Sequence, residues 1–291
     1  MKPRNLFLAF VPAAMVLLAS SVSAADWSCP TDSVKAWAMC VMERLDALET
    51  ENAALQARVD ELEGKLACVS MEAGEIDGLA GPHLIFTGVN IHIRSGSGST
   101  INMPWPDPPS GLGNLIIGYN EEPDGLLAGE RGGSHNLVVG PEHRYSSYGG
   151  LIAGFHNTSS WLYTSVTGGE NNRAGGYAAS VSGGFNNDSA GWATSVSGGS
   201  YNKAAGSGAG FAASVSGGSY NRAAGDNSSV SGGWDNTAGA VHSTVSGGNS
   251  NTASGLSASV SGGGSNVAAH DVSTVSGGWG TTTSSDFDHV P

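Results

Sequence analysis

One short unit recurs eleven times between residues 115 and 278, and eight of the copies read Ser/Thr-Val-Ser/Thr-Gly-Gly. Each copy has an apolar anchor that is followed three residues later by a glycine. Most anchors are 15 residues apart, with single spacings of 22, 14 and 19. A fixed short period indicates one backbone unit stacked on itself. The anchors are Leu115, Leu137, Leu151, Val166, Val181, Val196, Val215, Val230, Val245, Val260 and Val275.

A 15-residue unit is too short for two helices with their turns, which need roughly 30 residues, so helical solenoids are excluded. It is long enough for two short strands and two bends, and each coil then rises by about 4.8 Å. Alternation along Ser180-Val181-Ser182 directs the valine to one side and the hydroxyls to the other. The repeats predict a mainly β fold, a parallel β-roll or β-solenoid of about 11 coils with 14–15-residue repeats over residues 115–280.

An asparagine stands six residues after each valine of the complete coils. Asparagine suits bends because its amide bonds the local backbone, and stacked asparagines can bond one another. A small residue follows two positions later. The predicted structural asparagines are Asn172, Asn187, Asn202, Asn221, Asn236, Asn251 and Asn266. The small residues are Ala174, Ser189, Ala204, Ala223, Ala238, Ala253 and Ala268.

The expected core is thin, because each coil buries about one valine and one small residue. A larger stripe lies four residues before most valines, interrupted by Asp226 and Asp271. Packing of several rolls against one another would cover such a stripe. The stripe consists of Leu162, Tyr177, Trp192, Phe211, Val241 and Leu256.

The pattern Val-x-x-Gly-x-x-Asn-x-Ala-x-Gly resembles the head repeats of trimeric autotransporter adhesins, the YadA-type left-handed parallel β-roll. The resemblance covers residues 115–280, and the strands at Leu115-Ile116-Ile117-Gly118 and Leu137-Val138-Val139-Gly140 match best. It implies the roll, a homotrimer and attachment at a cell surface. The chain departs from the family in two ways: the expected coiled coil precedes the repeats, and the family's C-terminal membrane-anchoring segment is not found.

The first 24 residues have the pattern of a secretory signal peptide, with Lys2 and Arg4 before an apolar run and Val22-Ser23-Ala24 before the expected cleavage point. Residues 25–70 contain a heptad pattern that predicts a parallel coiled coil, a lone amphipathic helix being the alternative. Asn52 at an a position would fix its register. The a and d positions are Val34, Ala38, Val41, Leu45, Leu48, Asn52, Leu55, Val59, Leu62, Leu66 and Val69, and those from Leu45 to Leu66 form the predicted trimer interface.

Three cysteines follow the signal peptide, and an odd number in an exported protein indicates an interchain bridge or a free thiol. Cys40 and Cys68 lie too far apart on one helix to pair within a chain. Cys29 can pair with Cys40 if the preceding segment folds back, and Cys68 is then a candidate for linking protomers.

Residues 71–114 are expected to hold a linker, a strand at His83–Arg94 and a cap for the first coil, and residues 281–291 a polar tail that closes the solenoid or frays. The chain has 12 basic and 25 acidic residues, which disfavours nucleic acid and anionic surfaces as partners. We find no catalytic constellation and expect no enzyme, cofactor or metal. His135, His143 and His156 come nearest to a cluster, and we expect them in exposed loops.

Aromatic residues recur near the bends, where they either contact a ligand or pack on a neighbouring coil or protomer. These candidate ligand contacts are Phe185, Tyr201, Tyr220, Trp234 and Trp279. The function expected from the sequence is that of an exported, non-enzymatic structural or adhesive surface protein, a homotrimer that attaches to an extracellular glycan or matrix protein without inserting in a membrane.

The first alternative is a ligand-surface solenoid, such as an ice-binding or carbohydrate-binding protein, because hydroxyls flank every valine. Of these 16 flanking hydroxyls, 13 belong to serine, whereas a regular ice-binding face would favour threonine. The second alternative, a polysaccharide lyase or hydrolase, has no group of residues behind it.

Overall fold

The computed structural model describes residues 29, 30, 32–101, 108–205 and 211–291. The expected signal peptide lies outside these residues. The chain divides into two compact units, one up to Asn90 and one from Ile91 to Pro291.

The first unit consists of one long helix and a hairpin. Helix α2 (Val34–Leu66) begins at Ser33, whose Oγ accepts the backbone N–H of Ala36 at 3.1 Å. Strand β1 (Val69–Glu72) then pairs antiparallel with β2 (His83–Phe86). Two expectations need correction here. Val69 lies in a strand rather than at the last heptad position, and the expected strand His83–Arg94 ends at Phe86.

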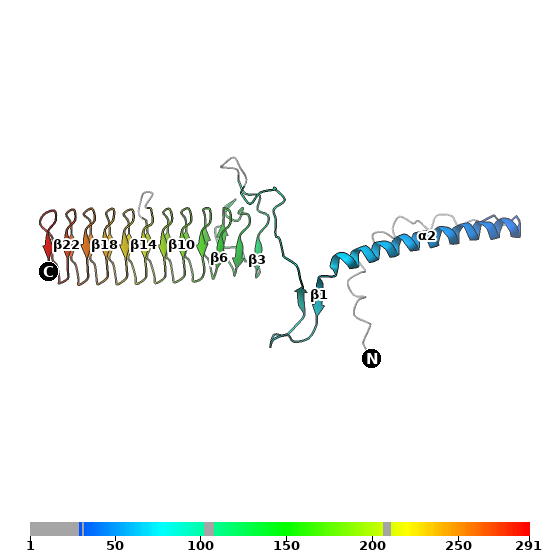
Figure 1. Cartoon of the computed structure of the whole chain (residues 1–291), viewed down its shortest axis with the longest axis horizontal. Coiled ribbons are helices and arrows are strands. Elements are labelled where there is room, and N and C mark those ends of the chain that lie inside the picture. Colours follow the sequence, from blue (N-terminus) through cyan, green and yellow to red (C-terminus); the bar gives the residue numbers. More distant parts are fainter. Residues whose placement is uncertain (1–28, 31, 102–107, 206–210) are drawn as a thin grey trace. The chain divides into compact units, whose positions relative to one another are not determined.

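The second unit contains a parallel β-solenoid of about 10 turns with repeats of about 15 residues (Figure 1). One sheet of 12 strands, here called the Val sheet, contains the valines of the repeat. Its strands are β3 (Leu115–Ile117), β4 (Leu137–Val139), β6 (Leu151–Ala153), β8 (Ser165–Val166), β10 (Ser180–Val181), β12 (Ser195–Val196), β14 (Ser214–Val215), β16 (Ser229–Val230), β18 (Thr244–Val245), β20 (Ser259–Val260), β22 (Thr274–Val275) and β23 (His289–Val290).

A second sheet of nine strands, here called the Ala sheet, contains the small residues that follow each asparagine. Within a coil, the first bend leads from the Val sheet to the Ala sheet and the second bend leads back. Its strands are β5 (Arg144–Tyr145), β7 (Thr158–Ser159), β9 (Arg173–Ala174), β11 (Asp188–Ser189), β13 (Lys203–Ala204), β15 (Arg222–Ala223), β17 (Thr237–Ala238), β19 (Thr252–Ala253) and β21 (Val267–Ala268).

The strand register corrects the first three anchors by one residue. Val166 pairs with Ile152, and Ile152 pairs with Val138, which in turn pairs with Ile116. The expected anchors Leu115, Leu137 and Leu151 therefore align with Ser165 and point outward. The physical reason lies in the first bend. In the three early coils a single glycine stands two residues after the core residue, whereas in the later coils glycines stand both two and three residues after the core valine.

The core is as narrow as the sequence predicts. It contains one file of Val or Ile side chains from Val138 to Val275 and one file of small residues from the Ala sheet, all buried. A third buried file stands two residues before each valine and includes Ala179, Thr194 and Ser228. Some hydroxyls in this core bond to one another, as Ser189 and Thr194 do at 2.8 Å, and others donate to a backbone carbonyl, as Ser228 does to Gly225 at 2.7 Å.

The seven predicted asparagines form a continuous ladder inside the first bend, and all are buried. From Asn172 to Asn251, each side-chain Oδ1 accepts the backbone N–H of the asparagine one coil further on, as Asn236 does from Asn251 at 3.0 Å. Each Nδ2 donates to a carbonyl of its own coil and to one of the next coil. The sequence prediction of stacked asparagines is confirmed, although most of the coil-to-coil bonds join a side chain to the main chain.

The ladder extends further than the sequence analysis recognised. Asn157 accepts the backbone N–H of Asn172, and Nδ1 of His143 accepts the backbone N–H of Asn157 at 3.2 Å. At the far end, the backbone N–H of Thr281 donates to Asn266, and β23 pairs with β22. The expected C-terminal tail thus adds a strand to the solenoid.

Candidate functional site

Aromatic side chains form one exposed file along the first bend. Phe185 and Tyr201 meet edge to face with ring centroids 5.4 Å apart, and Tyr220 and Trp234 do so at 6.1 Å. Between these pairs, Tyr201 and Tyr220 stack with an interplanar angle of 3° at 4.9 Å. Four of the five candidate ligand contacts therefore form one group, here called the first-bend file.

Trp279, the fifth candidate, does not join this group. It lies three coils beyond Trp234, with Asn249 and Gly264 in the positions between. Its ring lies against Gly264, where a side chain would collide with it. Sequence spacing could not exclude Trp279, because Trp234 and Trp279 occupy the same position of the repeat.

A second aromatic file lies along the second bend and contains half of the predicted apolar stripe. Tyr177 contacts Trp192 at 5.4 Å between centroids, and Trp192 contacts Phe211 at 5.7 Å. Tyr163, which the sequence analysis did not single out, extends the file by contacting Tyr177 at 5.7 Å. All four rings remain partly exposed.

The two aspartates that interrupt the stripe have a structural role. A carboxylate oxygen of Asp226 accepts the backbone N–H of Phe211 at 2.9 Å, and one of Asp271 accepts that of Leu256 at 2.8 Å. Each aspartate thus satisfies a donor of the preceding coil, a role that the stripe's apolar residues cannot fill.

The outer face of the Val sheet carries two files of hydroxyls, one on each side of the buried valines. Ser182 and Ser197 are exposed, and Ser180 and Ser195 are partly buried. The Oγ1 of Thr167 donates to the carbonyl of Ser182 at 2.9 Å, a bond between coils. The first glycine of each Gly-Gly pair lies beside these files, and at six of them, from Gly198 to Gly277, a side chain would meet nothing within 4 Å.

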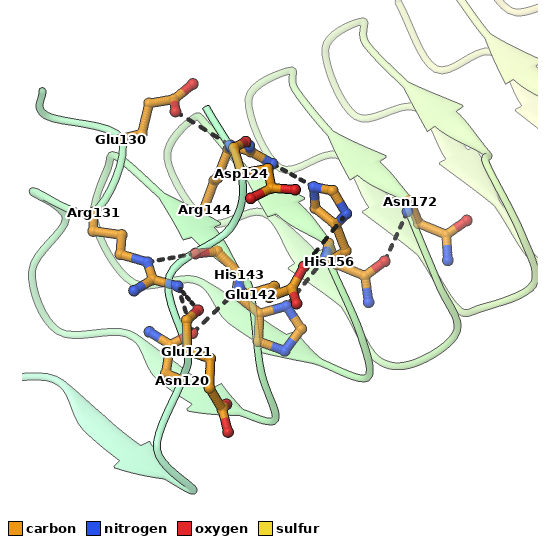
Figure 2. Close-up of polar contacts among 11 residues, drawn as sticks. Asn120, Glu121, Asp124, Glu130, Arg131, Glu142, His143, Arg144, His156 and Asn172 are labelled. Atoms are coloured by element: carbon orange, nitrogen blue, oxygen red, sulfur yellow. Dashed lines mark hydrogen bonds and ion pairs between the residues drawn. The ribbon is translucent and has the colours of Figure 1, made fainter. Parts of the chain in front are cut away.

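A polar cluster holds the loop of residues 118–136, between β3 and β4, against the first coils (Figure 2). Arg144 donates to Glu130 at 3.2 Å and to the carbonyl of Asp124 at 2.8 Å. Arg131 donates to the carbonyl of His143 at 2.9 Å and to the side chain of Asn120 at 3.2 Å. The backbone N–H of Leu127, together with Arg144, lowers the pKa of Glu130.

The histidine expectation needs correction at His143, which is fully buried rather than in an exposed loop. Its Nε2 lies 3.0 Å from the carbonyl of Val139, as the Nδ2 of an asparagine would. Because Nδ1 accepts the N–H of Asn157, Nε2 carries the proton and the ring is neutral. Burial, above all, lowers the pKa of His143. His143 stands six residues after Leu137, and this spacing is the signal that could have placed it in the ladder.

The predicted helix interface and the cysteines lie in the first unit. Helix α2 has no buried residue, and the side chains of Leu45, Leu48, Leu55, Val59, Leu62 and Leu66 are all exposed. Cys29 and Cys40 form a disulfide, as the sequence allowed, with an S–S distance of 2.06 Å. Cys68 is a free thiol, partly buried at the end of the helix.

No protein-family model and no curated protein matches this chain. Among the described residues, no helix is long and apolar enough to cross a membrane. The same part of the chain places no three His, Cys, Asp or Glu side chains where they could hold a metal ion.

Proposed function

We propose that the chain is an exported, non-enzymatic attachment protein, a homotrimer in which a parallel coiled coil joins three solenoids. The observation that carries the proposal is the unburied apolar face of α2. An isolated helix gains little from propensity alone and draws most of its stability from packing an apolar face. This helix has 33 residues, and its leucine and valine side chains from Leu45 to Leu66 are exposed.

The chemistry of α2 favours association of parallel copies in register. The helix is about 50 Å long at 1.5 Å per residue, which gives room for several layers of Leu and Val. Arg44 and Glu49, and likewise Arg58 and Glu63, occupy g and following e positions with opposite charges. Three copies rather than two follow from the resemblance of the repeats.

The solenoid supplies a surface on which hydroxyls recur in the eight Val-type coils and aromatic rings in several of them. Both kinds of group suit reversible contacts to a glycan or a matrix protein. Three solenoids held together would bind a repetitive target by avidity. Export is supported by the N-terminal sequence pattern and by the Cys29–Cys40 disulfide, because such bonds persist in oxidising compartments.

The test is the solution mass of the exported chain by light scattering after gel filtration, with and without reductant. We expect a trimer in both conditions, and in the oxidised sample a fraction linked through Cys68. Intact mass would place the N-terminus at Ala25. A monomer at micromolar concentration would refute the trimer and leave the face of α2 without a partner.

The hydroxyl files on the Val sheet support a second candidate function, a ligand-surface solenoid such as an ice-binding or carbohydrate-binding protein. The files are regular because each coil from Val166 to Val275 contributes one hydroxyl on each side of its valine. Measurable thermal hysteresis would support the ice-binding form of this function, and its absence at millimolar protein would exclude it.

A further inference from the structure

Basic residues of the solenoid gather on the outer face of one sheet. The chain from residue 115 onward has five Lys and Arg residues, and four of them are the outward residues of Ala-sheet strands. The parallel register aligns these outward positions in one file along the solenoid, here called the cation file. In order, the cation file contains Arg144, Thr158, Arg173, Asp188, Lys203 and Arg222.

The charges of this file are not balanced within the chain. Asp188 pairs with Arg173 at 3.2 Å and with Lys203 at 3.3 Å, and Arg144 pairs with Glu130. Arg222 is exposed and forms no ion pair with any described residue. Lys203 and Arg222 are direct partners in the register, so their Cα atoms lie about one strand spacing apart. Like charges in this position destabilise a sheet, which makes the pair an unusual feature of an acidic chain.

The stacked tyrosines of the first-bend file belong to the same two coils. Tyr201 and Lys203 flank the buried Asn202, and Tyr220 and Arg222 flank the buried Asn221. The tyrosines are 41% and 50% exposed. One face of each tyrosine covers the other, and Phe185 and Trp234 meet the pair edge to face. A ligand would therefore reach mainly ring edges and phenolic hydroxyls.

We infer that the outer face of β13 and β15 binds an acidic polysaccharide, with Lys203 and Arg222 contacting its carboxylate or sulfate groups and Tyr201 and Tyr220 contacting its hydroxyls. Arg and Lys bind such groups through charge-assisted hydrogen bonds, Arg with two at once. Beyond Arg222 the same file continues with Thr237 and Thr252, whose hydroxyls can bond neutral parts of a sugar chain. The inference names a ligand class for the proposed attachment function.

Other polyanions fit this face less well. The four residues from Arg173 to Arg222 comprise three cations and one carboxylate, and the whole chain has a net charge of −13. Nucleic acids and anionic membranes attract proteins through larger clusters of basic residues, about four to eight for a membrane. A glycan needs fewer charges, because its hydroxyls supply the remaining bonds.

The test measures binding of the full exported chain to immobilised polygalacturonate and heparin, with dextran as a neutral glycan and single-stranded DNA as another polyanion. We expect binding to at least one acidic glycan that weakens with salt, and none to dextran. The double variant Lys203→Gln/Arg222→Gln should weaken it about tenfold or more. The matched control Asn227→Asp/Ser257→Asp makes the same change in net charge at exposed residues of the second bend and should weaken it less than about twofold.

Equal losses in the two double variants would refute a local site, and so would DNA binding as tight as glycan binding. If the double variant has a lower melting temperature than wild type, the single variant Arg222→Gln replaces it, because that side chain forms no ion pair with any described residue. A monomeric mass with intact glycan binding would refute the proposed trimer and leave the glycan inference standing. A trimer that binds neither acidic glycan would refute this inference alone.

Discussion

Replacing Asn251 by alanine tests whether the asparagine ladder holds the coils together. The Asn251 side chain is fully buried and makes three hydrogen bonds. Its Oδ1 accepts the N–H of Asn266 at 3.0 Å, and its Nδ2 donates to the carbonyls of Gly247 at 2.9 Å and Gly263 at 3.0 Å. The alanine variant removes all three bonds without changing the outer surface.

The expected loss follows from which groups are left without partners. The carbonyl of Gly263 keeps the N–H of Asn249, but the N–H of Asn266 and the carbonyl of Gly247 have no other partner among the described hydrogen bonds. Each buried group left unpaired costs about 1–3 kcal/mol. We therefore expect Asn251→Ala to lower the free energy of unfolding by about 3–5 kcal/mol, including a small cavity.

The variant Asn251→Asp gives a pH-dependent form of the same test. An ionised carboxylate would face the two glycine carbonyls that now accept from Nδ2, so burial and repulsion should raise the pKa of the new carboxyl. The destabilisation is therefore largest above the raised pKa of the folded state, and it shrinks as the pH falls from there towards about 4, the pKa of an unfolded Asp, because the protonated acid can donate one bond. Asn249→Asp is the matched control, since Asn249 is exposed two residues away.

Urea unfolding monitored by circular dichroism gives the free energies, and hydrogen exchange of the Asn266 amide shows whether the loss begins at that coil. Exchange matters because coils of a solenoid can unfold locally. A change below about 0.5 kcal/mol for Asn251→Ala, with Asn266 still protected, would show that stacking of the strands alone holds the coils together.

Three further predictions follow from particular side chains. Burial lowers the pKa of His143, so the stabilising contribution of this residue is present above about pH 6.5 and is lost as the pH falls towards the pKa of the folded state. The melting temperature should therefore fall between pH 7 and pH 5. In the variant His143→Asn this fall should be smaller. Val272 is 46% exposed and has a φ of 56°, so Val272→Asn should stabilise by about 1 kcal/mol in urea unfolding, whereas Val267→Asn, in a strand, should destabilise. Leu55→Glu should turn the trimer into monomer in light scattering, whereas Ala53→Glu, outside the a and d positions, should leave it intact.

The solenoid itself follows from local sequence. A valine every 15 residues, followed by Gly-Gly and then asparagine, fixes the length of a coil, its bends and its inward residues, and the ladder from Asn172 to Asn266 has the predicted place. The same reasoning predicts a helix with a 3.5-residue apolar period, and α2 is present. Whether it forms a coiled coil remains a prediction, because that depends on other chains.

Only the tertiary structure revealed the features that depend on how one coil aligns with the next. The pairing of Val166 with Ile152 moved the first anchors by one residue, because hydrogen-bond register, not the spacing to a glycine, aligns strands. His143 replaces an asparagine because its two ring nitrogens reach the same partners. A reading of the sequence by residue type does not reveal that the two side chains are equivalent in shape. Lys203 and Arg222 are 19 residues apart in the chain, and only the stacking of one coil on the next makes them neighbours.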